Sequence, residues 1–173
     1  MANLNSWQRI TRVIPGRPFG NGSDGTYTSG TIPTLTVRSC SGAISSSTIT
    51  LTSAGFTDGD VVLIHQTRGT GAGQWEINKI SSGGGTTTLT LAKALVYDYL
   101  NSGNNKAQII KVMMYSSVAV ASGTWTLSAW DGTINGILPI ACTVDFGHAG
   151  TITGTSKGCD GCLSVAGTGD ATM

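Results

Sequence analysis

The sequence predicts an all-β protein, and three features of its composition support that class. Glycine accounts for 25 of 173 residues, and serine and threonine are frequent throughout, which is typical of short strands joined by tight turns. Apolar residues make up 39 % of the chain and occur in short, often alternating runs. Residues that favour long helices are scarce, and Glu76 is the only glutamate.

The individual strands follow from alternation and from the turns between them. In the run 44–52, Ile49 and Leu51 fall on one face of a strand. The run 61–67 is apolar enough to be buried on both faces, and 107–121 fits one long strand or two short ones. Further strand-like runs cover residues 34–40, 73–80, 86–95 and 137–146, with turns expected at 19–30, 56–60, 81–85 and 97–105.

These strand–turn units divide the chain into an N-terminal arm at 1–18, a β-rich domain at 19–158 and a tail at 159–173. Recurring short strands fit sandwiches, barrels and β-helices alike. No linker inside residues 19–158 separates a second domain.

The arm combines basic and apolar side chains, and Pro15 and Pro18 prevent regular structure at its end. Two interpretations stay open: docking on a neighbouring protein, or packing along its own domain. The residues expected to make the docking contact are Trp7, Arg9, Arg12 and Arg17.

Charge and hydropathy exclude several classes of protein. Only 11 % of residues are charged and the net charge is +1, which disfavours a nucleic-acid binder. No run reaches the roughly 18 apolar residues that a membrane span requires. The N-terminus has no apolar signal region, so we expect synthesis in the cytoplasm without a signal peptide, or a leader that has been lost.

A glycine-rich loop at Arg68, Gly69, Gly71 and Gly73 invites comparison with nucleotide-binding loops. A dinucleotide-binding loop needs glycines at positions one, three and six before a helix, whereas Gln74 stands at position six here and a strand-like run follows. The loop is therefore predicted to be the exposed tip of a hairpin between the strands 58–66 and 74–80.

The acidic residues and histidines favour structural roles. Asp58 and Asp60 lie in a turn, where aspartate is expected for its backbone hydrogen bonds, although a weak Ca²⁺ site from Asp58, Asp60 or Asp24 stays open. Glycosidase chemistry needs two carboxylates facing one cleft, a pattern that the sequence does not show. His65, inside an apolar run, is expected to be a strand residue, and we predict no enzymatic activity.

The four cysteines do not form a recognisable metal site. Cys40 and Cys142 stand alone in strand-like runs and are expected to be unpaired and buried, because a Cys₄ zinc site usually needs two close pairs. Cys159 and Cys162 leave open a disulfide or a partial metal site. No metal and no cofactor are predicted.

Three tryptophans are candidate contacts for a polysaccharide: Trp75, Trp125 and Trp130. Aromatic rings of this kind stack on sugars, but they are as often core or interface anchors. Both interpretations stay open.

Three stretches together resemble glycine- and threonine-rich surface proteins of phage virions and bacteria. Residues 19–31, "FGNGSDGTYTSGT", resemble the opening of many phage tail-associated proteins, and residues 55–80 resemble a glycine-rich segment of phage and bacterial surface proteins. Residues 130–146 and 150–158 are similar to the coil that usually follows. The resemblance covers most of 19–158 in the same order.

The resemblance implies a right-handed β-helix or elongated β-fold, often trimeric, to which no catalytic residues are assigned. We therefore expect an elongated β-sandwich or a short right-handed β-helix-like module with an extended N-terminal arm. The implied function is that of a structural protein on the virion surface, either capsid decoration or a tail fibre or spike module. Its partners would be copies of itself, as a trimer, and a capsid or tail protein.

Two other functions remain as alternatives. One is a bacterial surface or adhesin module that binds polysaccharide, including polysaccharide of a host surface, through exposed tryptophans. The other is a β-helix enzyme that cleaves polysaccharide with Asp58 or Asp60. The sequence does not show the clustered set of acidic residues that such an enzyme needs.

Overall fold

The computed structural model describes residues 20–159, and these contain eleven β-strands and no helix. The all-β prediction is confirmed. The predicted arm with its four docking residues lies outside the described residues, as does Cys162 of the tail. Residues 20–159 contain no helix long and apolar enough to cross a membrane.

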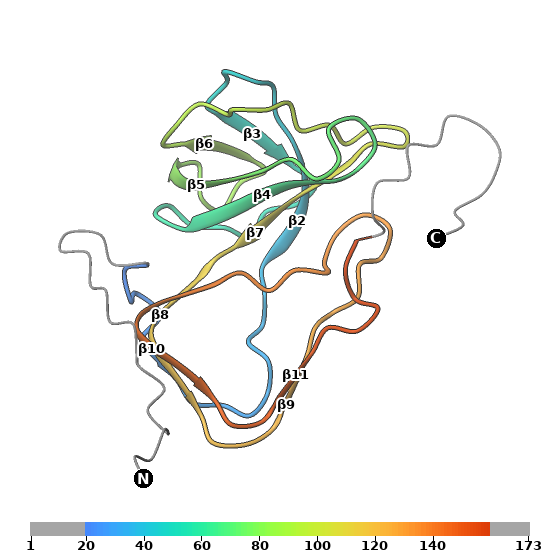
Figure 1. The fold of residues 1–173 in the computed structure, drawn as a ribbon. Helices are drawn as coiled ribbons and strands as arrows, with labels where there is room; N and C mark the ends of the chain where they lie inside the picture. Colours follow the sequence, from blue (N-terminus) through green and yellow to red (C-terminus); the bar gives the residue numbers. More distant parts are fainter. Residues whose placement is uncertain (1–19, 160–173) are drawn as a thin grey trace, which may run out of the picture.

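Six antiparallel strands form a closed barrel in the order β2-β3-β6-β5-β4-β7 (Figure 1). Closure pairs every strand on both sides, so the barrel has no free sheet edge. The elongated sandwich among our expectations is therefore wrong for this part of the chain. The barrel strands are β2 (Val37–Ser41), β3 (Thr48–Leu51), β4 (Val61–Arg68), β5 (Trp75–Ser82), β6 (Thr88–Leu91) and β7 (Lys106–Lys111).

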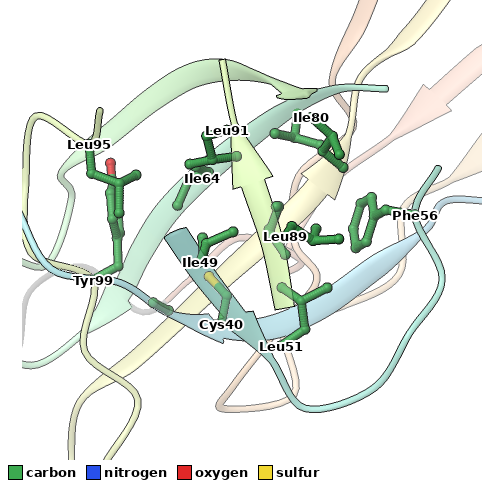
Figure 2. Close-up of a cluster of buried hydrophobic side chains, with 13 residues drawn as sticks. Cys40, Ile49, Leu51, Phe56, Ile64, Ile80, Leu89, Leu91, Leu95 and Tyr99 are labelled. Atoms are coloured by element: carbon green, nitrogen blue, oxygen red, sulfur yellow. The ribbon is translucent and has the colours of Figure 1, made fainter. Parts of the chain in front are cut away.

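Alternation along the strands fills the barrel interior. On β3 and β6, four apolar residues point inward while the threonines between them are exposed. Phe56 and Tyr99, from the loops, complete this core, which Figure 2 shows as one continuous cluster. Burying each such aliphatic side chain contributes about 1.5–3 kcal/mol. The inward residues of β3 and β6 are Ile49, Leu51, Leu89 and Leu91.

The run 107–121 consists of two strands that serve different parts of the fold. β7 pairs with β2 and β4 and closes the barrel. After Val112, β8 (Met113–Val120) leaves the barrel and enters a parallel sheet. Of the two possibilities that the sequence left open, one long strand or two short ones, the structure shows two strands.

The remaining strands form what we call the parallel stack, below the barrel in Figure 1. β1 (Thr26–Tyr27), β8 and β10 (Ile140–His148) make one sheet in the order β1-β8-β10. β9 (Thr124–Thr126) pairs with β11 (Thr151–Thr153) in a second. Parallel pairing of this kind agrees with our expectation of a β-helix-like module. The barrel is inserted into the parallel stack between β1 and β8.

Strands β8 and β9 are related to β10 and β11 by an offset of 27 to 28 residues. Ile140 pairs with Met113 and Ile152 pairs with Trp125, so both pairs are 27 residues apart. A β-bulge between Cys142 and Asp145 adds one residue before the pairing resumes. Among the described strands, the layers that we call penultimate (β8, β9) and last (β10, β11) therefore place like positions over one another.

Aromatic rings fill the interior of the stack around Trp125. Its ring meets Tyr27 at 5.6 Å, His148 at 4.6 Å and Phe146 at 6.2 Å, all edge to face. Its Nε1 donates to the carbonyl oxygen of Ser29 at 3.2 Å. Rings from three layers thus pack in one column.

An ion pair ties the 57–60 turn to the end of β7. Lys111 Nζ lies 2.9 Å from Asp60 Oδ1, and the Thr57 amide donates to Asp60 Oδ2 at 2.9 Å. Burial alone would raise the pKa of Asp60, but the Thr57 amide and the Lys111 ammonium outweigh burial and lower it. The hydrogen bond to Asp60 in turn raises the pKa of Lys111.

Asp60→Asn is expected to reduce stability by about 1 kcal/mol at pH 7, because it removes an ionised hydrogen-bond acceptor. The folded-state pKa of Asp60 lies below its unfolded value, so its contribution is full above the unfolded value and disappears as pH falls through the folded value. Urea unfolding of wild type and variant at pH 7 and at pH 3 measures this. The difference should shrink at pH 3, and an equal difference at both pH values would contradict it.

Candidate functional site

The predicted hairpin around the glycine loop is confirmed. β4 and β5 pair antiparallel from Val61 opposite Lys79 to His65 opposite Trp75. The three loop glycines have φ values of 84°, 75° and 90°, a left-handed conformation that L side chains rarely adopt. They serve the turn, and a strand follows them in place of the helix that a phosphate-binding loop requires.

Gly69→Ala is expected to destabilise the hairpin more than Gly73→Ala does. Both positions incur the left-handed penalty of about 1–2 kcal/mol. At Gly69 an added Cβ would also run into the side-chain oxygen of Asn105, which accepts the Thr70 amide at 2.8 Å, whereas nothing lies within 4 Å at Gly73. Urea unfolding of both variants measures the difference in stability. Equal losses of stability would show that Asn105 moves aside without an energetic cost.

The three candidate tryptophans lie in different environments. Trp75 is 59 % exposed on the outer face of the barrel, whereas Trp125 is 0 % exposed inside the parallel stack. Trp130 is half-buried, and its Nε1 has no hydrogen-bond partner among the described residues. No sugar can stack on Trp125 in this fold, so the prediction that Trp125 contacts a polysaccharide is wrong. Of the three tryptophans, Trp75 is the accessible one.

Trp75 belongs to an outward-facing apolar patch across β4 and β5. It lies opposite His65, and Ile77, which is also exposed, lies opposite Leu63. Partial burial lowers the pKa of His65, which favours the neutral ring at pH 7. The alternation of Trp75 and Ile77 was visible in the sequence, but only the barrel decides that this face points outward.

The acidic side chains bind backbone amides at turns. Asp58 Oδ1 accepts the amide of Gly84 at 2.7 Å, and Asp131 Oδ1 accepts the amide of Thr133 at 2.8 Å. Glu76 accepts the amide of Val96 at 3.1 Å. Across residues 20–159, no three acidic, histidine or cysteine side chains gather as a group that could hold a metal ion.

The three described cysteines differ in how deeply they are buried. Cys40 is fully buried in the barrel core, where burial raises its pKa far above the ordinary range, so the thiol stays protonated. Cys142, on β10, is half-buried, and its pKa is raised by the same cause. Cys159 is half-buried at the end of the described residues.

An open groove crosses the barrel surface between β3 and the segment 98–100. Its volume is about 390 Å³. Five of its nine lining residues carry a hydroxyl group, and Asp98 within it already accepts the amide of Ile44 at 2.8 Å. The side chains that line it include Ser41, Ser46, Thr48, Thr50 and Leu100.

The last layer of the stack carries exposed apolar residues that sequence reasoning did not single out. Val144, Phe146 and Ile152 lie on β10 and β11 and are all exposed. The run 137–146 was expected to be a strand, but nothing in it indicates which layer of a stack it would occupy. We refer to the surface formed by these three residues and the outer edges of β10 and β11 as the open end.

No protein-family model matches the chain, and no curated protein sequence matches it. Among solved structures it is similar to the tailspike protein gp49 from Pseudomonas phage LKA1, with a TM-score of 0.37 and 19 % identity over 56 % of this chain. It is also similar to the Gp54 tailspike of Acinetobacter baumannii bacteriophage AP22, solved in complex with A. baumannii capsular saccharide, with a TM-score of 0.37 and 16 % identity over 68 % of this chain. The matches cover 21 % of each tailspike.

Proposed function

We propose that this chain is a structural component of a phage virion, in the tail, that acts by assembly and docking rather than by catalysis. The observation that carries the proposal is the open end, where the stack exposes Val144, Phe146 and Ile152. Exposed apolar surface on a fold is the kind of surface that another polypeptide covers. The ordered resemblance of residues 19–158 to virion surface proteins supports the same function.

Low charge and a closed barrel fit such a component. The chain carries a net charge of +1, so it lacks the strong electrostatic field of a nucleic-acid binder. The acidic side chains Asp58, Glu76 and Asp131 bind backbone amides, which supports a scaffold role for them rather than an acid–base role. Capsid decoration, also consistent with the sequence, would place the same chain elsewhere on the particle.

Immunoelectron microscopy tests the proposal. An antibody raised against the purified chain is applied to particles from the strain that produces it. Gold label at the tail is the expected result, and label spread over the capsid would assign a decoration role instead. Particles that carry no label, although the chain is present in the producing cells, would overturn the proposal.

The arm and the trimer belong to the same proposal and have separate tests. Deletion of residues 1–18 should reduce the amount of chain retained on particles, and undiminished retention would remove the arm from the docking contact. Light scattering on the purified chain should give three times the monomer mass of 17.7 kDa.

A second function, polysaccharide binding, is favoured by the exposure of Trp75 beside Ile77. Saturable binding on a glycan array that Trp75→Ala abolishes would support it. Val96→Ala serves as the matched control, because that side chain is also 59 % exposed but carries no ring. Binding that survives Trp75→Ala, or no binding at all, would remove this patch as a sugar site.

A further inference from the structure

The barrel is an insertion in the parallel stack, and the chain enters and leaves it at neighbouring points (Figure 1). Within residues 20–159, the chain passes into the barrel at Thr36 and returns to the stack at Val112. The amide of Lys111 donates to the carbonyl oxygen of Thr36 at 2.9 Å, so the two connections lie side by side. The barrel and the stack also have separate apolar clusters. Two adjacent connections between separately packed parts have the geometry of a hinge.

A further segment of the stack is bound to the side of the barrel. We call residues 128–139, which link β9 to β10, the strap. Thr67 of β4, which is buried, donates its hydroxyl group to the carbonyl oxygen of Thr133 at 3.1 Å. Gln108 of β7, which is fully buried, donates to the carbonyl oxygen of Asn135 at 3.1 Å and accepts the Asn135 amide at 2.7 Å. All three hydrogen bonds join a barrel side chain to the main chain of the strap.

The strap covers an outward-facing part of the barrel surface. Ala107 and Ile109 belong to the core inside the barrel, so Gln108 and Ile110, which alternate with them along β7, face outward. Both outward residues are nonetheless 0 % exposed. The hydrogen bonds of Gln108 identify the strap as a segment that lies over this face. The strap therefore holds the barrel at a third point, farther along β7 than the connection at Val112.

The strap residue that Gln108 binds has an unusual backbone conformation. The φ of Asn135 is 75°, in the left-handed region that residues other than glycine rarely adopt. Gln108 binds both the amide and the carbonyl oxygen of this residue. Left-handed residues other than glycine persist where their surroundings hold them, and they cluster at clamps and switches. The contact between Gln108 and Asn135 therefore has the features of a latch.

We propose that the Gln108–Asn135 pair is a latch that fixes the orientation of the barrel on the stack, and that its release lets the barrel turn as a unit about the hinge at Thr36 and Val112. Both apolar clusters stay intact in the released state, because neither contains Gln108 or Asn135. The barrel and the stack present their surfaces in one fixed relation only while the latch is closed. This inference does not depend on the function proposed above.

Gln108→Glu tests the proposal with a side chain of nearly the same shape. A protonated carboxyl group donates to the Asn135 carbonyl oxygen and accepts the Asn135 amide, so it keeps the latch closed. An ionised carboxylate only accepts, and its second oxygen then repels that carbonyl oxygen. The variant is compared at pH 5, which favours the protonated form of a buried carboxyl group, and at pH 9, which favours the ionised form. Wild type at both pH values controls for His65, opposite position 108 on β4, and for Asp131 of the strap.

Two measurements on the full chain distinguish a latch from a purely structural contact. Dyes attached through noncanonical amino acids at Thr88 on the barrel and Ser122 beside the stack, both exposed, report the distance between the two parts by single-molecule energy transfer. Hydrogen exchange, corrected for the intrinsic rate at each pH, reports the protection of the Asn135 amide and of the strands on either side. Thr67→Val, which loses the bond to the strap, and Thr50→Val, at an exposed position on the barrel, are a matched pair.

At pH 9 we expect Gln108→Glu to exchange the Asn135 amide about tenfold faster or more and to show more than one dye distance, while amides of β3, β6 and β8 keep their protection. At pH 5 the variant should return to the single distance of wild type. Thr67→Val should speed exchange at Asn135, and Thr50→Val should not. A single unchanged distance for Gln108→Glu at pH 9 would show that the strap does not set the orientation. Loss of protection throughout the barrel would show that Gln108 is part of the barrel fold, and either result would overturn the proposal.

Discussion

Trp125→Ala is expected to lower the free energy of unfolding of the parallel stack by about 3–5 kcal/mol, the range for removing a large buried aromatic ring. The ring is fully buried and contacts Tyr27 on β1 and Phe146 and His148 on β10, so it joins its own layer to two others. Its loss leaves a cavity at the centre of the column and leaves the Ser29 carbonyl without its donor. Chemical denaturation measures the total effect.

Hydrogen exchange locates the effect within the molecule. Amides of β8–β11 should lose protection in Trp125→Ala, while barrel amides such as those of β3 and β6 keep it, because the two parts have separate apolar clusters. Trp75→Ala is the matched control: its ring is exposed, and we expect a change within about 0.5 kcal/mol. A loss for Trp125→Ala as small as that of the control would contradict the packing described for the stack.

Gln66→Leu is expected to cost about 3 kcal/mol or more, because a nearly isosteric apolar side chain removes every hydrogen bond that the buried amide makes to the backbone around it. Gln66 is fully buried, and its Oε1 accepts the amide of Leu100 at 2.8 Å. Its Nε2 lies 2.9–3.0 Å from the carbonyl oxygens of Arg68, Leu100 and Lys106. One side chain thus joins β4, β7 and the segment at residue 100.

Gln108→Leu provides the comparison for this effect. Gln108 is equally buried, but its amide bonds a single residue, Asn135, donating to the carbonyl oxygen at 3.1 Å and accepting from the amide at 2.7 Å. It fastens the segment after Asp131 to the outside of the barrel, so its replacement should cost less than that of Gln66. Urea unfolding of both variants gives the order, and a larger loss for Gln108→Leu would contradict it.

Several elements were predictable because their signal is local. The strand at β4 and its partner β5 follow from apolar runs bounded by turns, and the loop between them follows from the glycines at 69, 71 and 73. Alternation alone assigned Ile49 and Leu51 to one face. The aspartates in turns bind backbone amides, as their positions indicated.

Other elements left no local signal. β1 and β9 are only two and three residues long, and both lie in stretches rich in glycine, serine and threonine that are typical of turns. They are strands because β8 and β11 lie beside them in parallel register. Pairing between segments about 90 residues apart, as for Thr26 and Ser117, cannot be predicted from a window of neighbouring residues.

The sequence by itself determined the all-β class, most barrel strands, and the glycine hairpin, since these depend on periodicity of two and on the backbone freedom of glycine. Tertiary structure alone decided which apolar residues are buried. Trp75 and Trp125 have the same side chain, yet one is exposed on the barrel and the other is sealed between layers. Likewise, Ile152 differs from Trp125 in burial because no described strand follows its layer. Burial at a stack position depends on the strand one layer beyond, which lies outside any window of neighbouring residues in the sequence.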